Sequence, residues 1–99
     1  MTDWPMSESI VRAHIVVSGL VQGVCYRYFA FEQAEKLGLA GWVKNLPTGE
    51  VEAEAEGDRS AVEALIKALK IGPRAARVTD LKIQWIEPKG DASGFHVRY

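Results

Sequence analysis

The strict alternation of residues 50–56 constrains the fold more than any other stretch of this sequence. Small apolar residues separate four glutamates there: Glu50, Val51, Glu52, Ala53, Glu54, Ala55 and Glu56. Successive side chains of a β-strand point to opposite faces, so this period of two predicts a strand with all the carboxylates on one face. Because like charges on one face repel each other, we expect that face to lie in solvent rather than to hold a metal ion.

Four more segments are predicted as β-strands. The period of two recurs in residues 11–18, which end at a glycine, and again in residues 81–85 and 95–99. Residues 40–45 form a short apolar stretch. The turn composition that follows, Leu-Pro-Thr-Gly, predicts a hairpin between this stretch and the glutamate strand.

Two segments are predicted as helices. Residues 26–37 carry apolar side chains on one helical face and stop at a glycine, which is typical of a helix C-terminus. Residues 60–71 show the same spacing, and Ser60 and Glu63 have the spacing of a capping box, with Asp58 as the competing cap. The order of elements predicts an α+β fold of the ferredoxin-like βαββαβ kind, in which two helices cover one face of an antiparallel sheet.

The length and charge of the chain limit its organisation and its partners. The 99 residues suffice for one domain, which we assign to residues 10–99, and the polar, aperiodic residues 1–9 are predicted to form a flexible tail. A net charge of -1 argues against nucleic-acid binding. With no apolar run long enough for a bilayer, no signal-peptide pattern and a single cysteine, we expect a cytoplasmic monomer without a membrane partner.

Arg27 is the first residue whose position calls for a chemical explanation. It lies in the first turn of the predicted helix 26–37, where unpaired N–H groups and the helix dipole already carry positive charge. No Asp or Glu occurs between Val11 and Phe31, so either a distant acid or a bound anion must compensate. The glycines of the preceding loop allow positive φ, and successive N–H groups before a helix bind anions, to which a guanidinium adds a bidentate clamp. An Arg27 that simply lies in solvent is an equally open alternative.

Other phosphate and nucleophile chemistries fit the sequence less well. Val24 stands where a Walker loop needs its second glycine, and Phe31 stands where a phosphatase loop that starts at Cys25 needs its arginine. Cys25 has no evident base partner, and the two histidines lie far apart without metal-ligand spacing. We therefore expect neither a catalytic thiol nor a metal or cofactor.

Two long motifs of the chain resemble the signatures of the acylphosphatase family. Residues 19–27 read GLVQGVCYR, and residues 41–57 read GWVKNLPTGEVEAEAEG. The resemblance extends from about residue 10 to Tyr99. It implies hydrolysis of the carboxyl–phosphate bond of small acyl phosphates to a carboxylate and inorganic phosphate, without metal or cofactor. By position it implies that Asn45 orients the attacking water and that the phosphate is held by Arg27 and by the backbone N–H groups of Val21, Gln22, Gly23 and Val24.

Two other functions remain open on the sequence. A nucleic-acid-binding module on a ferredoxin-like fold needs exposed aromatic and basic residues on a central strand, where this chain has Glu52, Glu54 and Glu56. A non-catalytic phosphate-binding domain, like the acylphosphatase-like segment of larger carbamoyl-transfer maturation proteins, would carry the same loop. The stand-alone length favours the enzyme.

Overall fold

The computed structural model describes residues 9–90 and 93–99, so the predicted tail, apart from Ser9, lies outside the described residues. The elements follow the predicted order. They are β1 (Ile10–Leu20), α1 (Tyr26–Lys36), β2 (Ala40–Asn45), β3 (Val51–Asp58), α2 (Arg59–Ile71), β4 (Arg77–Ile86) and β5 (Phe95–Arg98). Neither of the two described helices is long and apolar enough to cross a membrane.

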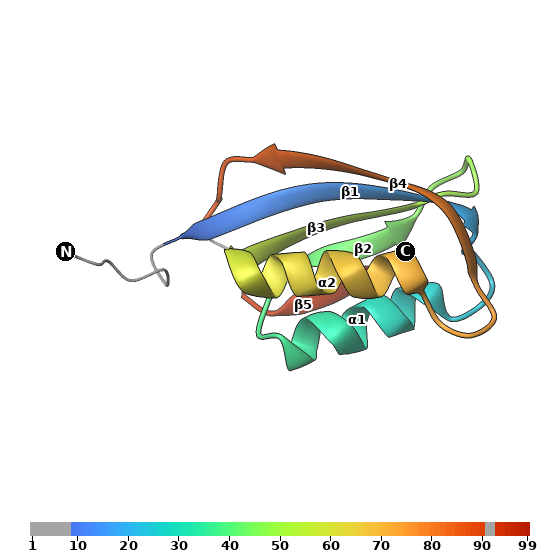
Figure 1. The fold of residues 1–99 in the computed structure, drawn as a ribbon, viewed down its shortest axis with the longest axis horizontal. Coiled ribbons are helices and arrows are strands. Elements are labelled where there is room, and N and C mark those ends of the chain that lie inside the picture. Colours follow the sequence, from blue (N-terminus) through green and yellow to red (C-terminus); the bar gives the residue numbers. More distant parts are fainter. Residues whose placement is uncertain (1–8, 91–92) are drawn as a thin grey trace.

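The strands form one sheet in the order β4-β1-β3-β2-β5, and both helices lie on the same face of it (Figure 1). The predicted α+β fold is confirmed, and β4, β1, β3 and β2 pair in antiparallel fashion as expected. The last strand differs, because β5 runs parallel to β2 and makes the sheet mixed. A period of two predicts that a segment is a strand, but it does not predict which strand lies beside it or in which direction that strand runs. The strands β4 and β5 form opposite edges of the sheet, and the pairing of β5 with β2 depends on this long-range arrangement.

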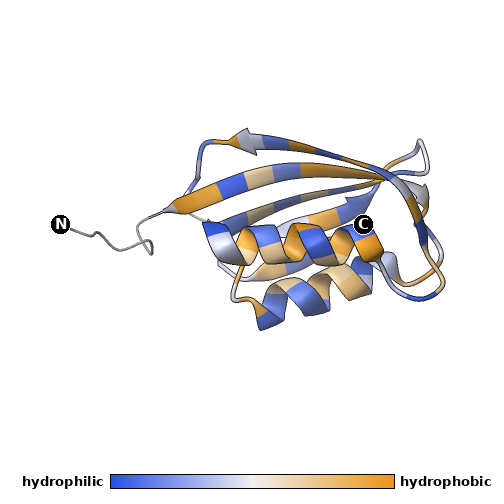
Figure 2. Cartoon of the chain, viewed as in Figure 1, coloured by the Kyte–Doolittle hydropathy of each residue, from blue (hydrophilic) through white to orange (hydrophobic). Residues whose placement is uncertain are grey.

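The core lies between the sheet and the two helices. Hydropathy alternates along the central strands (Figure 2), and the residues that turn toward the helices are fully buried, among them Ala13, Ile15, Val43 and Ala55. The Tyr26 hydroxyl donates a 2.6 Å hydrogen bond to the Leu69 carbonyl and so joins α1 to α2 inside this core. The start of α2 differs from the predicted capping box, because the N-cap is Asp58 and no side chain caps the helix.

The face of the sheet opposite the helices is not the solvated layer of carboxylates that the alternation predicted. Arg12 on β1 is only 3% exposed, and its guanidinium pairs with Glu54 at 2.7 Å and with Glu56 at 2.9 Å. Glu56, 8% exposed, also accepts hydrogen bonds from the backbone amides of Lys89 and Gly90. His14 lies 2.6 Å from Glu52. The prediction was wrong because the register of β1 on β3 sets basic residues opposite the glutamates, and a strand's own sequence does not reveal that register.

The buried position of Glu56 predicts a loss of stability in acid. Burial alone would raise the pKa of Glu56, but the two amides and the Arg12 guanidinium outweigh it and hold this pKa below the ordinary value of 4.5. A carboxyl whose pKa is lowered by folding stabilises the protein above its unfolded pKa, and the contribution disappears as the pH falls through the folded one. We expect the free energy of unfolding, from urea denaturation, to fall more steeply below pH 4.5 in the wild type than in Glu56→Gln. The exposed Glu63→Gln is the control and should keep the wild-type slope.

Candidate active site

The loop of residues 21–25 between β1 and α1 forms one wall of the candidate site. β1 continues one residue past Gly19, where the pairing with β4 shifts register. Gly19 has φ +124°, and a Cβ there would lie 2.1 Å from the Arg77 carbonyl oxygen, so only glycine fits this close approach. Gly23 follows with φ +74°, and Cys25, the N-cap of α1, has φ +61°. Three left-handed residues thus turn the chain from strand into helix.

The backbone amides of this loop are available to a ligand. Within residues 9–90 and 93–99, none of the amides from Val21 to Val24 donates a hydrogen bond to a backbone carbonyl. The first turn of α1 contains no acidic residue, and no side chain caps it. Unpaired N–H groups that lead into a helix N-terminus carry partial positive charge and attract anions.

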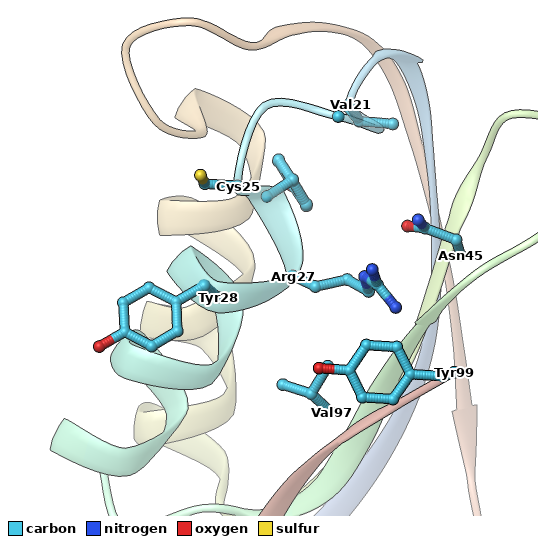
Figure 3. Close-up of a pocket in the computed structure, with 9 residues that line it drawn as sticks. Val21, Cys25, Arg27, Tyr28, Asn45, Val97 and Tyr99 are labelled. Atoms are coloured by element: carbon cyan, nitrogen blue, oxygen red, sulfur yellow. The ribbon is translucent and has the colours of Figure 1, made fainter.

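Arg27 extends from the first turn of α1 across the site toward the end of β5 (Figure 3). Its Nη1 donates a 3.0 Å hydrogen bond to the Arg98 carbonyl oxygen, and its guanidinium carbon lies 4.7 Å from the centre of the Tyr99 ring. These two contacts occupy one N–H group and one face of the guanidinium. No other acceptor among residues 9–90 and 93–99 bonds to the guanidinium, so its remaining N–H groups can bind a ligand, and the side chain does not simply extend into solvent.

Asn45 is the last residue of β2 and extends into the space between the loop and Arg27 (Figure 3). Its Oδ1 is buried and has no hydrogen-bond partner among the described residues. A buried acceptor without a partner costs about 1–3 kcal/mol, so folded proteins rarely keep one unless a ligand or a water molecule satisfies it.

These groups surround one pocket of about 200 Å³. Its lining residues are Val21, Gly23, Cys25, Tyr26, Arg27, Tyr28, Asn45, Val97 and Tyr99. Arg27 is the only charged side chain in that set, which gives the pocket a positive character. A pocket with one guanidinium, unpaired amides and an orphan acceptor suits an oxyanion together with one water molecule.

Four of the six predicted site residues line the pocket in the structure. Val21, Gly23, Arg27 and Asn45 meet at the pocket, although Arg27 and Asn45 belong to different elements. Gln22 and Val24 do not line it. Tyr99 and Val97 were not predicted as site residues, because their position depends on the parallel pairing of β5 with β2. The left-handed conformation of Cys25 was also missed, because residue type gives little signal for it outside glycine.

The fold and the pocket together define a ferredoxin-like α+β domain with a pocket between a strand-to-helix loop and the sheet. The family model described as Acylphosphatase matches residues 13–97. The acylphosphatase of Anaeromyxobacter dehalogenans is 52% identical over 89 residues, which are 90% of this chain and 96% of that protein. The crystal structure of acylphosphatase from Bacillus subtilis has a TM-score of 0.87 and 38% identity, and it covers 90% of this chain and 99% of that one. The chain belongs to the acylphosphatase family.

A larger protein contains a similar domain. The crystal structure of HypF from T. kodakarensis matches with a TM-score of 0.79 and 33% identity, over 90% of this chain but only 12% of HypF. The acylphosphatases, in contrast, match over nearly their whole length. The expected family and the expected acylphosphatase enzyme are thus confirmed.

Proposed function

We propose that this acylphosphatase cleaves the carboxyl–phosphate bond of small acyl phosphates with Arg27 and the amides of Val21 to Val24 holding the phosphate and Asn45 orienting the water. The main support is Asn45, whose Oδ1 is buried without a hydrogen-bond partner among the described residues and which lines the same pocket as Arg27 and the start of the loop. Neither group alone would indicate a reaction, but together they supply a place for an oxyanion and a place for its nucleophile.

The phosphate is held by charge and by geometry. The guanidinium donates two parallel hydrogen bonds to phosphate oxygens, and the loop amides donate to the others. Negative charge on these oxygens offsets the positive N-terminus of α1 and the adjacent cation. The contact of Arg27 with the Arg98 carbonyl oxygen and the Tyr99 ring fixes the direction of the guanidinium before substrate binds.

The water is positioned by a hydrogen bond that it donates to the Asn45 Oδ1. A lone pair of its oxygen then forms the new P–O bond, while the bond from phosphorus to the carboxyl oxygen breaks and its electron pair leaves with the carboxylate. The proton released by the water passes to a phosphate oxygen, because Asn45 is a neutral amide and cannot accept it. The products are a carboxylate and inorganic phosphate.

This leaving group needs no acid catalyst. The conjugate acid of a departing carboxylate has a pKa of about 4, so the group leaves without taking up a proton at neutral pH. Hydrogen-bond donors for the phosphate and one acceptor for the water are therefore sufficient. Such a site lowers the barrier by placing the reactants and by stabilising the charge of the transition state.

Asn45→Ala is expected to lower kcat about 10²- to 10³-fold, the usual effect of removing one well-aimed polar group from such a site. The measurement is phosphate release from a simple acyl phosphate in the presence of a metal chelator. Gln84→Ala, on the exposed part of β4, is the control and should keep the wild-type rate. An Asn45→Ala enzyme as fast as the wild type would contradict the role of Asn45. Loss of wild-type activity on chelation would contradict a reaction without a metal.

We also propose that the protein acts in the cytoplasm as a monomer and binds neither nucleic acid nor membranes. The near-neutral charge and the single cysteine support this proposal. Sedimentation of the purified protein, alone and with duplex RNA, tests it. A dimer or a complex at micromolar concentration would contradict it.

A further inference from the structure

The side chain of Gln22 lies in the loop of the proposed phosphate site but turns away from the pocket. Its Nε2 donates one hydrogen bond to the Leu46 carbonyl oxygen and another to the Glu50 carbonyl oxygen, each 2.8 Å long. These carbonyls begin and end the turn that joins β2 to β3, directly after Asn45 and directly before Val51. The side-chain amide nitrogen of Gln22 thus bonds to both ends of that turn.

The two carbonyls are also those that close the turn itself. The Leu46 amide donates to the Glu50 carbonyl oxygen at 2.8 Å, and the Gly49 amide donates to the Leu46 carbonyl oxygen at 3.1 Å. Each oxygen has two lone pairs, so Gln22 takes the second acceptor position of each. The turn is complete without Gln22, and what Gln22 adds is a connection between the turn and the phosphate loop.

This connection matters because no hydrogen bond from the described residues holds the Asn45 Oδ1. The position of the Asn45 side chain depends on its backbone, which is followed immediately by the Leu46 carbonyl that Gln22 holds. The loop amides and the water-orienting amide belong to different elements, and a misplacement of about 1 Å between reacting groups can lower a rate about 10²-fold.

From these contacts we infer that Gln22 is a positioning residue, which sets the distance between the phosphate-holding loop and the water on Asn45. The inference rests on the proposed function. The side chain of Gln22 touches neither the phosphate nor the water and acts through the backbone of the turn, whereas its backbone amide stays among the amides proposed to hold the phosphate. Its loss should therefore impair the attack of water more than the binding of phosphate.

A second connection keeps the turn in place when Gln22 is replaced. The Glu50 carboxylate accepts hydrogen bonds from Ser18 at the end of β1 and from Thr48 in the turn, at 2.9 and 2.8 Å. The turn thus stays attached to the sheet, and we expect a variant of Gln22 to remain folded with an altered site.

Gln22→Met keeps the length of the side chain but removes both donors. We expect kcat for acyl-phosphate hydrolysis to fall about 10- to 100-fold, the range typical of residues that orient an active-site group. The inhibition constant of inorganic phosphate should change less than about threefold, because Arg27 and the loop amides remain. Gln84→Met is the matched control, with an exposed glutamine, and should keep the wild-type kcat.

Gln22→Glu supplies a second, independent readout. The ionised side chain of the new glutamate can only accept hydrogen bonds, so the two carbonyl oxygens repel it. The protonated side chain can donate a hydrogen bond to one of them. The kcat of Gln22→Glu relative to the wild type should therefore rise as the pH is lowered from about 7 to 5. A residue needed only for stability would show no such recovery.

A double-mutant cycle separates this inference from the proposed function. If Gln22 acts through Asn45, then Gln22→Met should cost less than about twofold in an Asn45→Ala background. If the double variant instead loses the product of the two single-variant losses in kcat, Gln22 does not act through Asn45. That result, or a Gln22→Met enzyme with wild-type kcat, would overturn the positioning role and leave the role of Asn45 intact. An Asn45→Ala enzyme with wild-type kcat would instead overturn the proposed function.

Discussion

Replacing Arg27 by alanine should lower kcat/KM for acyl-phosphate hydrolysis by at least 10²- to 10³-fold. Among the described residues, Arg27 is the only charged side chain that lines the pocket, and the Arg98 carbonyl oxygen and the Tyr99 ring hold its guanidinium. The guanidinium stabilises the negative charge on the phosphoryl oxygens during transfer. Its loss should therefore weaken transition-state stabilisation as well as substrate binding. Steady-state kinetics of phosphate release measure the effect.

Two further variants show whether charge alone explains the loss. Arg27→Lys should recover little of the rate, because an ammonium group lacks the planar fork that binds two phosphate oxygens and stacks on an aromatic ring. Arg74→Ala removes an exposed arginine and should keep the wild-type kinetics. Full activity in Arg27→Lys would show that Arg27 acts only as a point charge, and full activity in Arg27→Ala would contradict its role in holding phosphate.

Replacing Arg12 by alanine should lower the free energy of unfolding by about 3–5 kcal/mol. Its guanidinium is almost fully buried between Glu54 and Glu56, and without it two adjacent carboxylates remain on one face with little access to water. Breaking a buried ion pair by removing one partner leaves the other charge buried with less compensation, here the Lys89 ammonium 3.6 Å from Glu54 and two backbone amides on Glu56. Urea denaturation at pH 7 measures the loss, which is a large part of the stability of a domain of this size.

The matched control for this prediction is an exposed ion pair on α2. Arg59 lies 3.9 Å from Glu63, both more than half exposed, and surface pairs contribute about 0–1 kcal/mol. Arg59→Ala should therefore change the free energy of unfolding far less than Arg12→Ala. The triple variant Arg12→Met, Glu54→Gln, Glu56→Gln should recover part of the stability, since it removes the uncompensated charges. Equal losses in Arg12→Ala and Arg59→Ala would contradict a structural role for the buried cluster.

The fold was predictable wherever local pattern determines structure. The alternation of residues 50–56 predicted β3, and the helical spacing predicted both ends of α1 and of α2 to within one residue. Pairing across the sheet was not predictable from single strands. The parallel alignment of β5 and the burial of Glu56 beside Arg12 both depend on which strands become neighbours and in what register, and long-range packing decides these.

The candidate site was predictable to the extent that its chemistry is local. The position of Arg27 at a helix start without a nearby acid indicated an anion, and the motif resemblance added Asn45. The sequence could not predict that Tyr99 lines the pocket. It also could not predict that the Gln22 side chain reaches the turn between β2 and β3. Both involve residues more than twenty positions apart in the sequence, which only the folded chain brings together.

We expect the loop amides and the Arg27 guanidinium to bind one phosphate group together. Titration of ¹⁵N-labelled protein with inorganic phosphate in chelator-containing buffer, followed by NMR, tests it most directly. Joint binding predicts saturable shifts confined to the amides of residues 21–27, the Arg27 Nε–H and the Asn45 side-chain amide, all lost in Arg27→Ala. Saturable shifts centred elsewhere on the chain, or none in this loop at a phosphate concentration that inhibits the enzyme, would contradict it.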